Sequence, residues 1–297
     1  MSDVKAISEG YAKRIAVTGW CRKALWRIDN TRRAQRGGDR RALGWRFGAP
    51  PFRMRRFRPD ESTRNMTYVF EPPARPAVPV AGSDALFPVR RIFCVARNYA
   101  AHAREMGHDP EREPPFFFCK PADAVLPVAS GALGALPYPQ ATQNLHHEFE
   151  LVVALGKGGR DLTPEQAAEC VWGYACGFDM TRRDLQAQAK EKGQPWDSGK
   201  AFDYAAPISH ILHRGHAPLL ATGEIVLKVN GEERQRGDLS DMTWSIPEVI
   251  AHLSRLWTLK AGDLVFTGTP EGVGPVVSGD RMEGHIEGVG SISILVS

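Results

Sequence analysis

The chain has 297 residues, 42% of them hydrophobic, and a formal net charge of +4, so it is long enough for one large domain or two modest ones with an ordinary buried core. No apolar run reaches the roughly 18 to 20 residues of a membrane span, and no secretory signal opens the chain. The five cysteines include no CxxC pair, which argues against a disulfide framework and a cysteine-type zinc site. We therefore expect a cytoplasmic protein that does not enter a membrane.

The positive charge belongs to the N-terminal segment alone. Residues 1–65 hold 17 Lys and Arg against 6 Asp and Glu, a net charge of +11, whereas the remaining residues hold 21 against 28, a net charge of −7. The segment has no sustained period, so we expect little stable structure beyond one helix near residues 10–28. We favour a poorly ordered extension without a selected role, with Met66 as an alternative start. A nucleic-acid-binding arm, with arginines among stacking aromatic residues, and an Arg-rich transit peptide stay open.

The stretch that follows, residues 66–88, carries five prolines and predicts an extended lead-in with one or two short strands. Residues 90–96 then predict a strand, and residues 98–107 predict a short helix closed by Gly107. Residues 114–121 are rich in phenylalanine between prolines, which predicts a brief buried strand. Residues 146–156 alternate and then run apolar, the pattern of a strand that enters the core.

Capping boxes mark the two clearest helices, because a hydroxyl and a Glu or Gln three residues later satisfy the free N–H groups of the first turn. Thr163 and Gln166 open a predicted helix over residues 164–172, and Ser245 and Glu248 open one over residues 246–257.

The C-terminal half adds strands. Residues 224–237 predict a hairpin around the type I′ turn Asn230-Gly231, and late strands are expected over residues 262–269 and 291–297. Strands outnumber helices and there is no alternating βαβα order. The sequence therefore indicates a mixed, mainly β fold of the α+β class.

Glu148 and Glu150 are the first candidate functional pair. Residues two apart on a strand share a face, so both carboxylates are expected to point the same way. Their strand is otherwise apolar, and burying two like charges together is costly without a cation. A hard divalent ion with oxygen ligands would compensate them, with Asp179, just after an apolar run, as the third ligand. A solvated strand face stays open, as does zinc or iron bound by His146 and His147.

His102 and Glu105 are the second candidate pair. Three apart on the expected helix, they share a face, and a carboxylate beside an imidazole fixes its tautomer, as a general base requires. Lys120 and Lys200 lie among apolar or small residues, where an ammonium group can stabilise an oxyanion. Taken singly, such a pair is more often a surface contact, and such a lysine more often extends its charge into solvent.

Two glycine-rich stretches, residues 156–159 and 268–274, match neither the P-loop nor the dinucleotide fingerprint. Tight turns explain them best. A substrate carboxylate held by N–H groups and the hydroxyl at Gly268-Thr269 is the functional alternative.

Seven motifs, taken together, resemble the fumarylacetoacetate hydrolase family, and specifically its smaller acylpyruvate-cleaving members. They occur in family order over about residues 89–297, roughly 70% of the chain, and the ordered set is far more specific than any one motif. Ala96 is a departure, since the family commonly has Gly there. The motifs are Arg97-Asn-Tyr-Ala-Ala-His102-Ala-Arg-Glu105, Lys120-Pro, His147-Glu148-Phe-Glu150-Leu, Gly177-Phe-Asp179-Met-Thr-Arg-Arg183-Asp-Leu-Gln186, Gly199-Lys200-Ala-Phe, Val229-Asn-Gly and Phe266-Thr-Gly-Thr-Pro-Glu-Gly-Val-Gly-Pro275.

The resemblance implies a rolled, mixed β-sheet fold with short peripheral helices over residues 89–297, commonly in a homodimer, and says nothing of residues 1–65. It implies Mg²⁺ or Mn²⁺ held by Glu148, Glu150 and Asp179. It makes His102 the general base, oriented by Glu105, and adds two catalytic cations, Lys120 and Lys200. The residues expected to hold the substrate are Arg97, Tyr99, Arg183, Gln186, Gly268 and Thr269.

The chemistry of these residues predicts cleavage of a small 2-oxo acid. Its carboxylate and keto oxygens would chelate the metal, a Lewis acid that stabilises the enolate formed as the C–C bond breaks. Water activated by His102 would attack the distal carbonyl, and Lys120 or Lys200 would stabilise the oxyanion. Without the water step, the same enolate chemistry would decarboxylate oxaloacetate.

Residues 193–203 look most like fumarylpyruvate hydrolases of gentisate-type aromatic breakdown, so hydrolysis of fumarylpyruvate to fumarate and pyruvate is the leading hypothesis. Its distal carboxylate needs a cationic partner, for which Arg104, Arg112 and Arg183 are the candidates. Acylpyruvase or oxaloacetate decarboxylase activity is an alternative, as is the isomerase and decarboxylase of 2-hydroxyhepta-2,4-diene-1,7-dioate. A nucleic-acid-binding protein that uses the basic segment is the alternative of another class, and the intact set of catalytic residues weighs against it.

Overall fold

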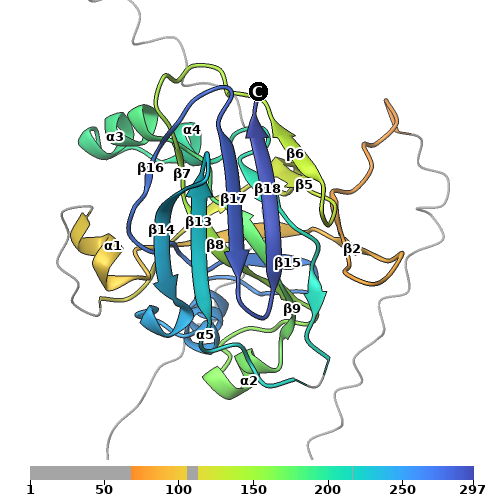
Figure 1. The fold of residues 1–297 in the computed structure, drawn as a ribbon. Helices are drawn as coiled ribbons and strands as arrows, with labels where there is room; N and C mark the ends of the chain where they lie inside the picture. The colour runs from red at the N-terminus through yellow and green to blue at the C-terminus, as the bar shows by residue number, and fades with distance from the viewer. Residues whose placement is uncertain (1–67, 106–112, 216) are drawn as a thin grey trace, which may run out of the picture. The chain divides into compact units, whose positions relative to one another are not determined.

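Strands dominate the part of the chain that the computed structural model describes, residues 68–105, 113–215 and 217–297. They form sheets of eight, five, three and two strands, and the helices lie at the periphery (Figure 1). The predicted mixed, mainly β fold is therefore confirmed. The helix expected near residues 10–28, the helix cap at Gly107 and Arg112 lie outside the described residues.

The eight-stranded sheet runs in the order β4-β3-β15-β8-β9-β11-β5, with β12 beside β9. All seven residues of β8 are buried, because β15 and β9 flank it and the five-stranded sheet packs against it. The strands are β3 (Arg91–Ala96), β4 (Phe116–Lys120), β5 (Val125–Pro127), β8 (Phe149–Leu155), β9 (Val171–Phe178), β11 (Ala206–Ile208), β12 (Leu212–His213) and β15 (Asp263–Phe266).

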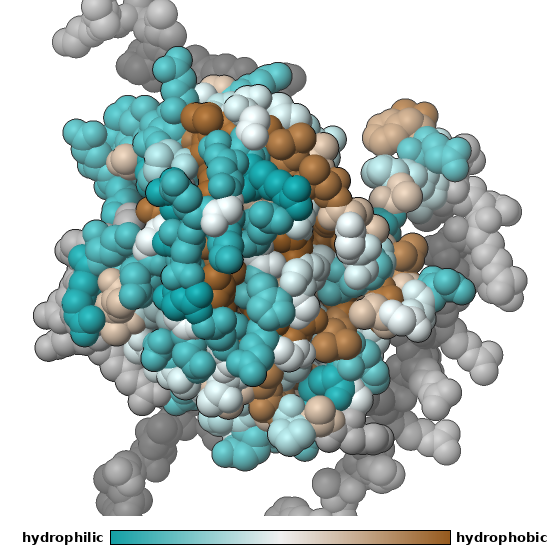
Figure 2. Space-filling view, in the orientation of Figure 1, coloured by the Kyte–Doolittle hydropathy of each residue, from teal (hydrophilic) through white to brown (hydrophobic). Residues whose placement is uncertain are grey.

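The five-stranded sheet runs in the order β14-β13-β17-β18-β6. The predicted hairpin is confirmed as its first two strands, and both turn residues, Asn230 and Gly231, have the positive φ of a type I′ turn. Hydrophilic side chains cover much of the outer face of the hairpin (Figure 2). Among the residues of β14, the exposed Arg236 pairs with Glu224 and Glu233. The strands are β6 (Leu133–Leu136), β13 (Glu224–Val229), β14 (Glu232–Asp238), β17 (Arg281–Ile286) and β18 (Gly290–Val296).

The eight-stranded and five-stranded sheets pack closely against each other. Strand β13 contacts β8, and β17 and β18 contact β9. At Gly284 of β17 a Cβ atom would lie only 2.3 Å from the ring of Phe149, so this approach needs glycine. Phe149 lies between Glu148 and Glu150 in the sequence, so the five-stranded sheet packs directly against the segment that carries both glutamates.

The expected strand over residues 146–156 is interrupted. Its first part, β7, belongs to the three-stranded sheet β10-β7-β16, whereas its second part, β8, belongs to the eight-stranded sheet, and Glu148 lies at the break between them. The lead-in holds the two short strands of the fourth sheet, as expected. The remaining strands are β1 (Ala77–Pro79), β2 (Leu86–Pro88), β7 (Leu145–His147), β10 (Thr181–Arg182) and β16 (Gly274–Val276).

Two predicted elements need correction. The helix expected over residues 164–172 keeps its capping box but ends at Ala168, because the chain enters β9 at Val171. The strand expected to be buried over residues 114–121 is an edge strand, so Phe116 is exposed. The helices are α1 (Ala100–Glu105), α2 (Pro164–Ala168), α3 (Arg183–Glu191), α4 (Asp197–Lys200) and α5 (Ile246–Leu256), with 3-10 helices η2 (Ala122–Ala124) and η3 (Leu239–Asp241).

Among the described residues, no helix is long and apolar enough to cross a membrane.

Candidate metal and catalytic site

Three carboxylates meet where β8 pairs with β9. Glu148 lies at the break before β8, Glu150 within it, and Asp179 directly after β9, whose last residue pairs with Phe149. Ligand oxygens of the three lie within 4.8 Å of one another, and all three side chains are buried. The structure therefore brings together the three predicted metal ligands.

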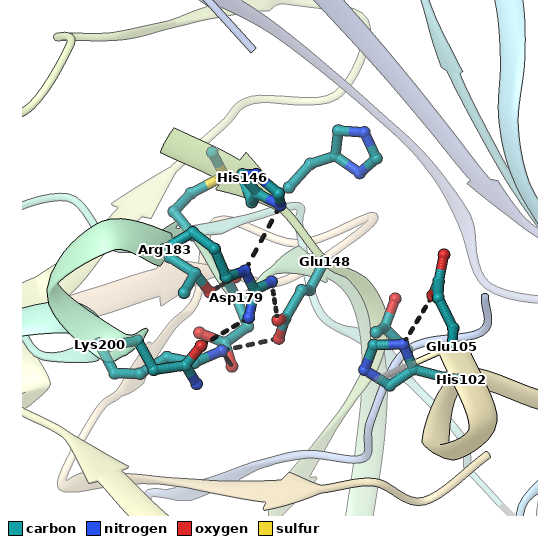
Figure 3. Close-up of polar contacts among 12 residues, drawn as sticks. His102, Glu105, His146, Glu148, Asp179, Arg183 and Lys200 are labelled. Atoms are coloured by element: carbon teal, nitrogen blue, oxygen red, sulfur yellow. Dashed lines mark hydrogen bonds and ion pairs between the residues drawn. The ribbon is translucent and has the colours of Figure 1, made fainter. Parts of the chain in front are cut away.

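Three cations surround two of these carboxylates. Lys200 Nζ lies 2.7 Å from both Glu148 Oε2 and Asp179 Oδ2 (Figure 3). Arg183 contacts the other oxygen of Glu148 at 2.6 Å, and Lys120 contacts the other oxygen of Asp179 at 2.8 Å. Burial alone would raise the pKa of Glu148, but Lys200 and Arg183 hold it well below its usual range. Glu148 is therefore ionised, and these contacts fix the orientation of both carboxylates.

Glu150 is in a different position. Within the described part of the chain it makes no ion pair, and its one hydrogen bond comes from the N–H of Gly268, 2.7 Å from Oε2. Burial, together with the charges of Asp179 and Glu148, raises the pKa of Glu150 well above its usual range. A divalent cation would supply the missing positive charge, and three carboxylate oxygens are the ligands that hard ions prefer. The residues present therefore fit Mg²⁺ or Mn²⁺.

The two histidines before Glu148 face other partners. His147 Nδ1 lies 3.1 Å from Gln235 Oε1, and His146 lies between Asn144 and Arg183. Burial lowers the pKa of each histidine to about 4, so both are neutral near pH 7. Neither belongs to the group of side chains that can share an ion. The zinc or iron alternative is therefore not supported.

His102 and Glu105 face this cluster from α1 (Figure 3). His102 Nδ1 lies 3.1 Å from Glu105 Oε2, as their spacing predicts, and the ring is buried. The other oxygen of Glu105 accepts a hydrogen bond from the N–H of Gly272 at 3.1 Å. Glu105 thus fixes the imidazole and leaves Nε2 as the ring nitrogen available to a reactant.

One cleft of about 480 Å³ connects the two groups. It contains most of the predicted site residues from both sides, together with five that the sequence did not suggest. The lining residues are Val95, Ala96, Arg97, His102, Phe118, Glu148, Glu150, Arg183, Gln186, Lys190, Trp196, Lys200 and Thr269.

Five predicted residues do not line the cleft: Asp179 and Glu105, whose contacts are given above, and Lys120, Gly268 and Tyr99. Lys120 is buried behind Asp179. Its Nζ forms an ion pair with Asp179 Oδ1 at 2.8 Å and donates hydrogen bonds to the carbonyl oxygens of Met180 and Lys200. It is placed to orient Asp179 and, because it does not line the cleft, it is not placed for the oxyanion role that the sequence suggested. The N–H of Gly268 is likewise used by Glu150. Tyr99 is buried, and its hydroxyl has no hydrogen-bond partner among the residues described.

Sequence reasoning missed Lys190, Trp196, Phe118 and Gln235. Lys190 lies four residues after Gln186 on α3, so helical spacing could have placed it on the cleft side. Gln235 could have been found from the hairpin register, because it pairs with the buried Leu227. For the aromatic pair, whose rings lie 5.9 Å apart, no local pattern gives a signal, since the contact joins β4 to the residue before α4.

Comparison with known proteins agrees with this geometry. The family model described as fumarylacetoacetate (FAA) hydrolase C-terminal matches residues 91–297. The crystal structure of a fumarylpyruvate hydrolase from Pseudomonas aeruginosa, in complex with Mn²⁺ and pyruvate, is 56% identical in sequence. It superposes with a TM-score of 0.76, over 77% of this chain and 99% of that one.

Two curated relatives carry different names. A fumarylpyruvate hydrolase of Ralstonia sp. is 44% identical over 188 residues, which cover 63% of this chain and 95% of the relative. The mitochondrial oxaloacetate tautomerase of Bos taurus is 43% identical over 207 residues, 70% of this chain and 91% of the relative. With the ordered motifs and the carboxylate site already described, these matches show that the chain is an enzyme of the fumarylacetoacetate hydrolase family, with that family's rolled, mainly β fold.

Proposed function

We propose that the protein is a metal-dependent hydrolase that cleaves the C–C bond of a small acylpyruvate, namely fumarylpyruvate, to give fumarate and pyruvate. The observation that carries the proposal is one cleft in which a buried carboxylate cluster faces the His102–Glu105 pair. Two relatives named fumarylpyruvate hydrolases, one of them solved with Mn²⁺ and pyruvate, support the substrate and Mg²⁺ or Mn²⁺ as the metal.

The reaction follows from the groups that line the cleft. His102, with Nδ1 held by Glu105, takes a proton from water at Nε2, and the water oxygen attacks the distal carbonyl carbon. The C–C bond then breaks, fumarate leaves, and the electron pair passes to the methylene carbon of pyruvate, which takes up a proton. When bound, the metal ion supplies a Lewis acid for the 2-oxo acid end of the substrate. Lys200, which lines the cleft, supplies further positive charge there.

The charge balance of the site favours a dicarboxylate. The three carboxylates are matched by the charges of Lys120, Lys200 and Arg183. A divalent ion would therefore leave the filled site with two excess positive charges. Arg97 and Lys190 also line the cleft and add to this positive charge. The two carboxylates of fumarylpyruvate offset it more fully than the single carboxylate of a simple acylpyruvate such as acetylpyruvate.

The distal carboxylate needs its own partner, and the three arginines suggested by the sequence do not supply it. Arg104 is exposed and is not among the lining residues, and Arg183 is engaged with Glu148 and Gln186. Arg112 lies outside the described residues. Arg97 and Lys190 do line the cleft, and neither side chain has a hydrogen bond or ion pair within the described part.

Arg97 is the stronger of these two cations. Its φ of 60° lies in the left-handed region, which costs a non-glycine residue about 1–2 kcal/mol. The next residue, Asn98, holds this turn, since its side chain donates to the carbonyl oxygens of Trp244 and Thr267. Such strain is concentrated at functional sites. We therefore assign Arg97, assisted by Lys190, to the distal carboxylate.

The test is pyruvate release from fumarylpyruvate, acetylpyruvate and oxaloacetate, with and without EDTA and with Mn²⁺ added back. We expect the highest kcat/KM for fumarylpyruvate, loss of activity in EDTA and recovery with Mn²⁺. Activity that survives chelation would contradict the metal-dependent mechanism. Turnover of acetylpyruvate at the same kcat/KM would contradict the dicarboxylate preference.

Oxaloacetate chemistry is the second candidate function, favoured by the relative named oxaloacetate tautomerase. Enolate formation in the same cleft without attack by water would decarboxylate or tautomerise oxaloacetate. Faster turnover of oxaloacetate than of fumarylpyruvate would replace the first proposal by this one. A homodimer and a cytoplasmic location stay predictions from the sequence.

A further inference from the structure

Gln235 is a buried polar side chain on an otherwise polar strand. It pairs with Leu227 across the hairpin, and residues opposite each other on neighbouring strands share a face. Leu227 is fully buried, and Gln235 is 1% exposed. Of the seven residues of β14, Gln235 alone is buried. A carboxamide in such a place must find partners inside the protein.

It finds four of them. Nε2 donates to Thr269 Oγ1 at 2.7 Å and to the carbonyl oxygen of Pro270 at 2.8 Å. Oε1 accepts from the N–H of Phe149 at 3.1 Å and lies 3.1 Å from His147 Nδ1. The backbone N–H and carbonyl fix which end of the carboxamide is oxygen, so His147 must carry its proton on Nδ1. Both N–H groups and both lone pairs of Gln235 are thereby used.

The position of these partners explains why a side chain is needed. Strand β15 pairs with β8 as far as Phe266, and Thr267 still donates to Leu151. The chain then diverges from β8, leaving the N–H and carbonyl of Phe149 without a strand partner on that side. Gln235 accepts from this N–H, and the hydroxyl of Thr269 donates to this carbonyl at 2.9 Å. The carboxamide replaces a peptide group at the point where the two chains separate.

The segments that Gln235 joins are those of the active site. Glu148 lies between two of its partners, His147 and Phe149. Gly268, which holds Glu150, directly precedes a third partner, Thr269, which lines the cleft. One side chain from the five-stranded sheet therefore sets the distance between the carboxylate segment and the Gly268–Thr269 segment.

We propose that Gln235 is a positioning residue of the metal site. Gln235 does not line the cleft, so it acts through its partners and not on the metal or the substrate. It holds the segment of Glu148 and the hydroxyl of Thr269 in the arrangement that binds the metal ion and the substrate. Groups that orient metal ligands from behind typically contribute about 10–100-fold to metal affinity or activity. The inference rests on the proposed function for its activity readout, whereas binding of Mn²⁺ alone tests it independently.

The experiment compares Gln235→Met with Ser254→Ala. Methionine keeps the volume of glutamine and removes all four contacts. Ser254, on α5, is equally buried and also bridges two backbone groups, from Leu162 N to the carbonyl of Ala251, but does so away from the cleft. Melting temperature, the Kd of Mn²⁺ from electron paramagnetic resonance, and kcat and KM are measured for both variants.

We expect both variants to melt at lower temperature and only Gln235→Met to weaken Mn²⁺ binding, by about 10–100-fold, with a matching fall in kcat. A Kd and a kcat within twofold of the unsubstituted protein would overturn the proposal and leave Gln235 a purely structural residue. If Gln235→Met does not fold, Gln235→Glu, which keeps the size and the acceptor end, takes its place with the same criteria. If the unsubstituted protein does not cleave fumarylpyruvate, the proposed function is refuted. If Gln235→Met nevertheless binds Mn²⁺ more weakly than the unsubstituted protein, the present inference holds.

Discussion

The two walls of the cleft are built differently. The carboxylate wall carries Glu148, Glu150 and Asp179, and all four oxygens of Glu148 and Asp179 contact cations. Gln235 holds the segment of Glu148 on the side away from the cleft. The α1 wall carries His102 and Glu105. The Glu105 side chain is 35% exposed, and its only hydrogen bond beyond α1, among the residues described, comes from the N–H of Gly272. The carboxylate wall is thus assembled before any substrate arrives, whereas the position of the general base depends on few contacts. Substitutions in the first wall should change metal binding or stability, and those in the second should change turnover alone.

The largest effect is expected from Glu150→Gln. Metal affinity should fall at least about 100-fold, since even groups that only orient ligands are worth 10–100-fold, and pyruvate release should fall with it. The melting temperature should change little, because Glu150 makes no ion pair in the described part and the carboxamide oxygen of the variant can still accept from the N–H of Gly268. Mn²⁺ titration by electron paramagnetic resonance and a thermal melt check both statements. Unchanged Mn²⁺ affinity would remove Glu150 from the ligand set.

His102→Ala tests the other wall. Loss of a general base costs about 10²–10⁴-fold, so hydrolysis of fumarylpyruvate should fall by this factor while the Kd of Mn²⁺ stays constant. Decarboxylation of oxaloacetate, which needs no activated water, should fall much less. Both rates are measured on the same preparation, with Glu105→Gln as the milder variant. Equal losses in the two reactions would exclude a water-activating role for His102.

Lys120→Met separates orientation from catalysis within the carboxylate wall. Breaking a buried ion pair costs about 3–5 kcal/mol, and both Lys120 and Asp179 are almost fully buried. We expect a loss of this size in the free energy of unfolding, measured with urea. Lys157→Met is the matched control, because its ion pair with Glu169 has a similar length but is exposed, and it should leave stability unchanged. Comparable stability of the two variants would contradict the buried role of Lys120.

Arg97→Met should change substrate preference. A hydrogen bond to a charged group contributes about 1.5–3 kcal/mol, so kcat/KM for fumarylpyruvate should fall roughly 10–100-fold, whereas that for acetylpyruvate should not change. Steady-state assays with both substrates measure the ratio. Lys190→Met should give a smaller change in the same direction, since Lys190 is exposed at the cleft. An equal fall for both substrates would assign Arg97 to the pyruvate end.

The sequence predicted much of the carboxylate wall, although for reasons that were partly incomplete. Strand alternation placed Glu148 and Glu150 on one face, and the motif order supplied Asp179. Glu148 in fact lies outside β8, where the chain passes from the three-stranded to the eight-stranded sheet. Its orientation is set by Lys200 and Arg183, which come from distant segments. Local periodicity cannot reveal such a junction, because it depends on which sheets meet.

The burial of lysines was equally hard to predict. Lys120 follows four residues of an edge strand that are exposed or half-buried, yet it is itself 2% exposed, because its ammonium group contacts the buried Asp179 and the last residue of α4. A lysine in an aromatic stretch gives no sign of this from sequence alone. By contrast, the helix caps and the hairpin turn depend on residues close in sequence, and the structure confirms both.

The smallest effect concerns the start of α3, which carries Arg183 and Gln186 into the cleft. Partial burial would raise the pKa of Asp184, but hydrogen bonds from the Thr142 hydroxyl and from the N–H groups of Gln143 and Leu185 lower it. A pKa that is lower in the folded chain stabilises the fold above the unfolded value of about 3.9, and this stabilisation is lost as the pH falls through the folded value.

Asp184→Asn should therefore reduce the free energy of unfolding by a constant amount from pH 7 to pH 5, and the difference from the unsubstituted protein should shrink below about pH 4. Urea unfolding at several pH values and fixed ionic strength measures this difference. A difference that stayed constant down to pH 3.5 would show that the hydrogen bonds, and not the charge, hold the start of α3. In that case the carboxylate wall would gain its rigidity from contacts that do not titrate.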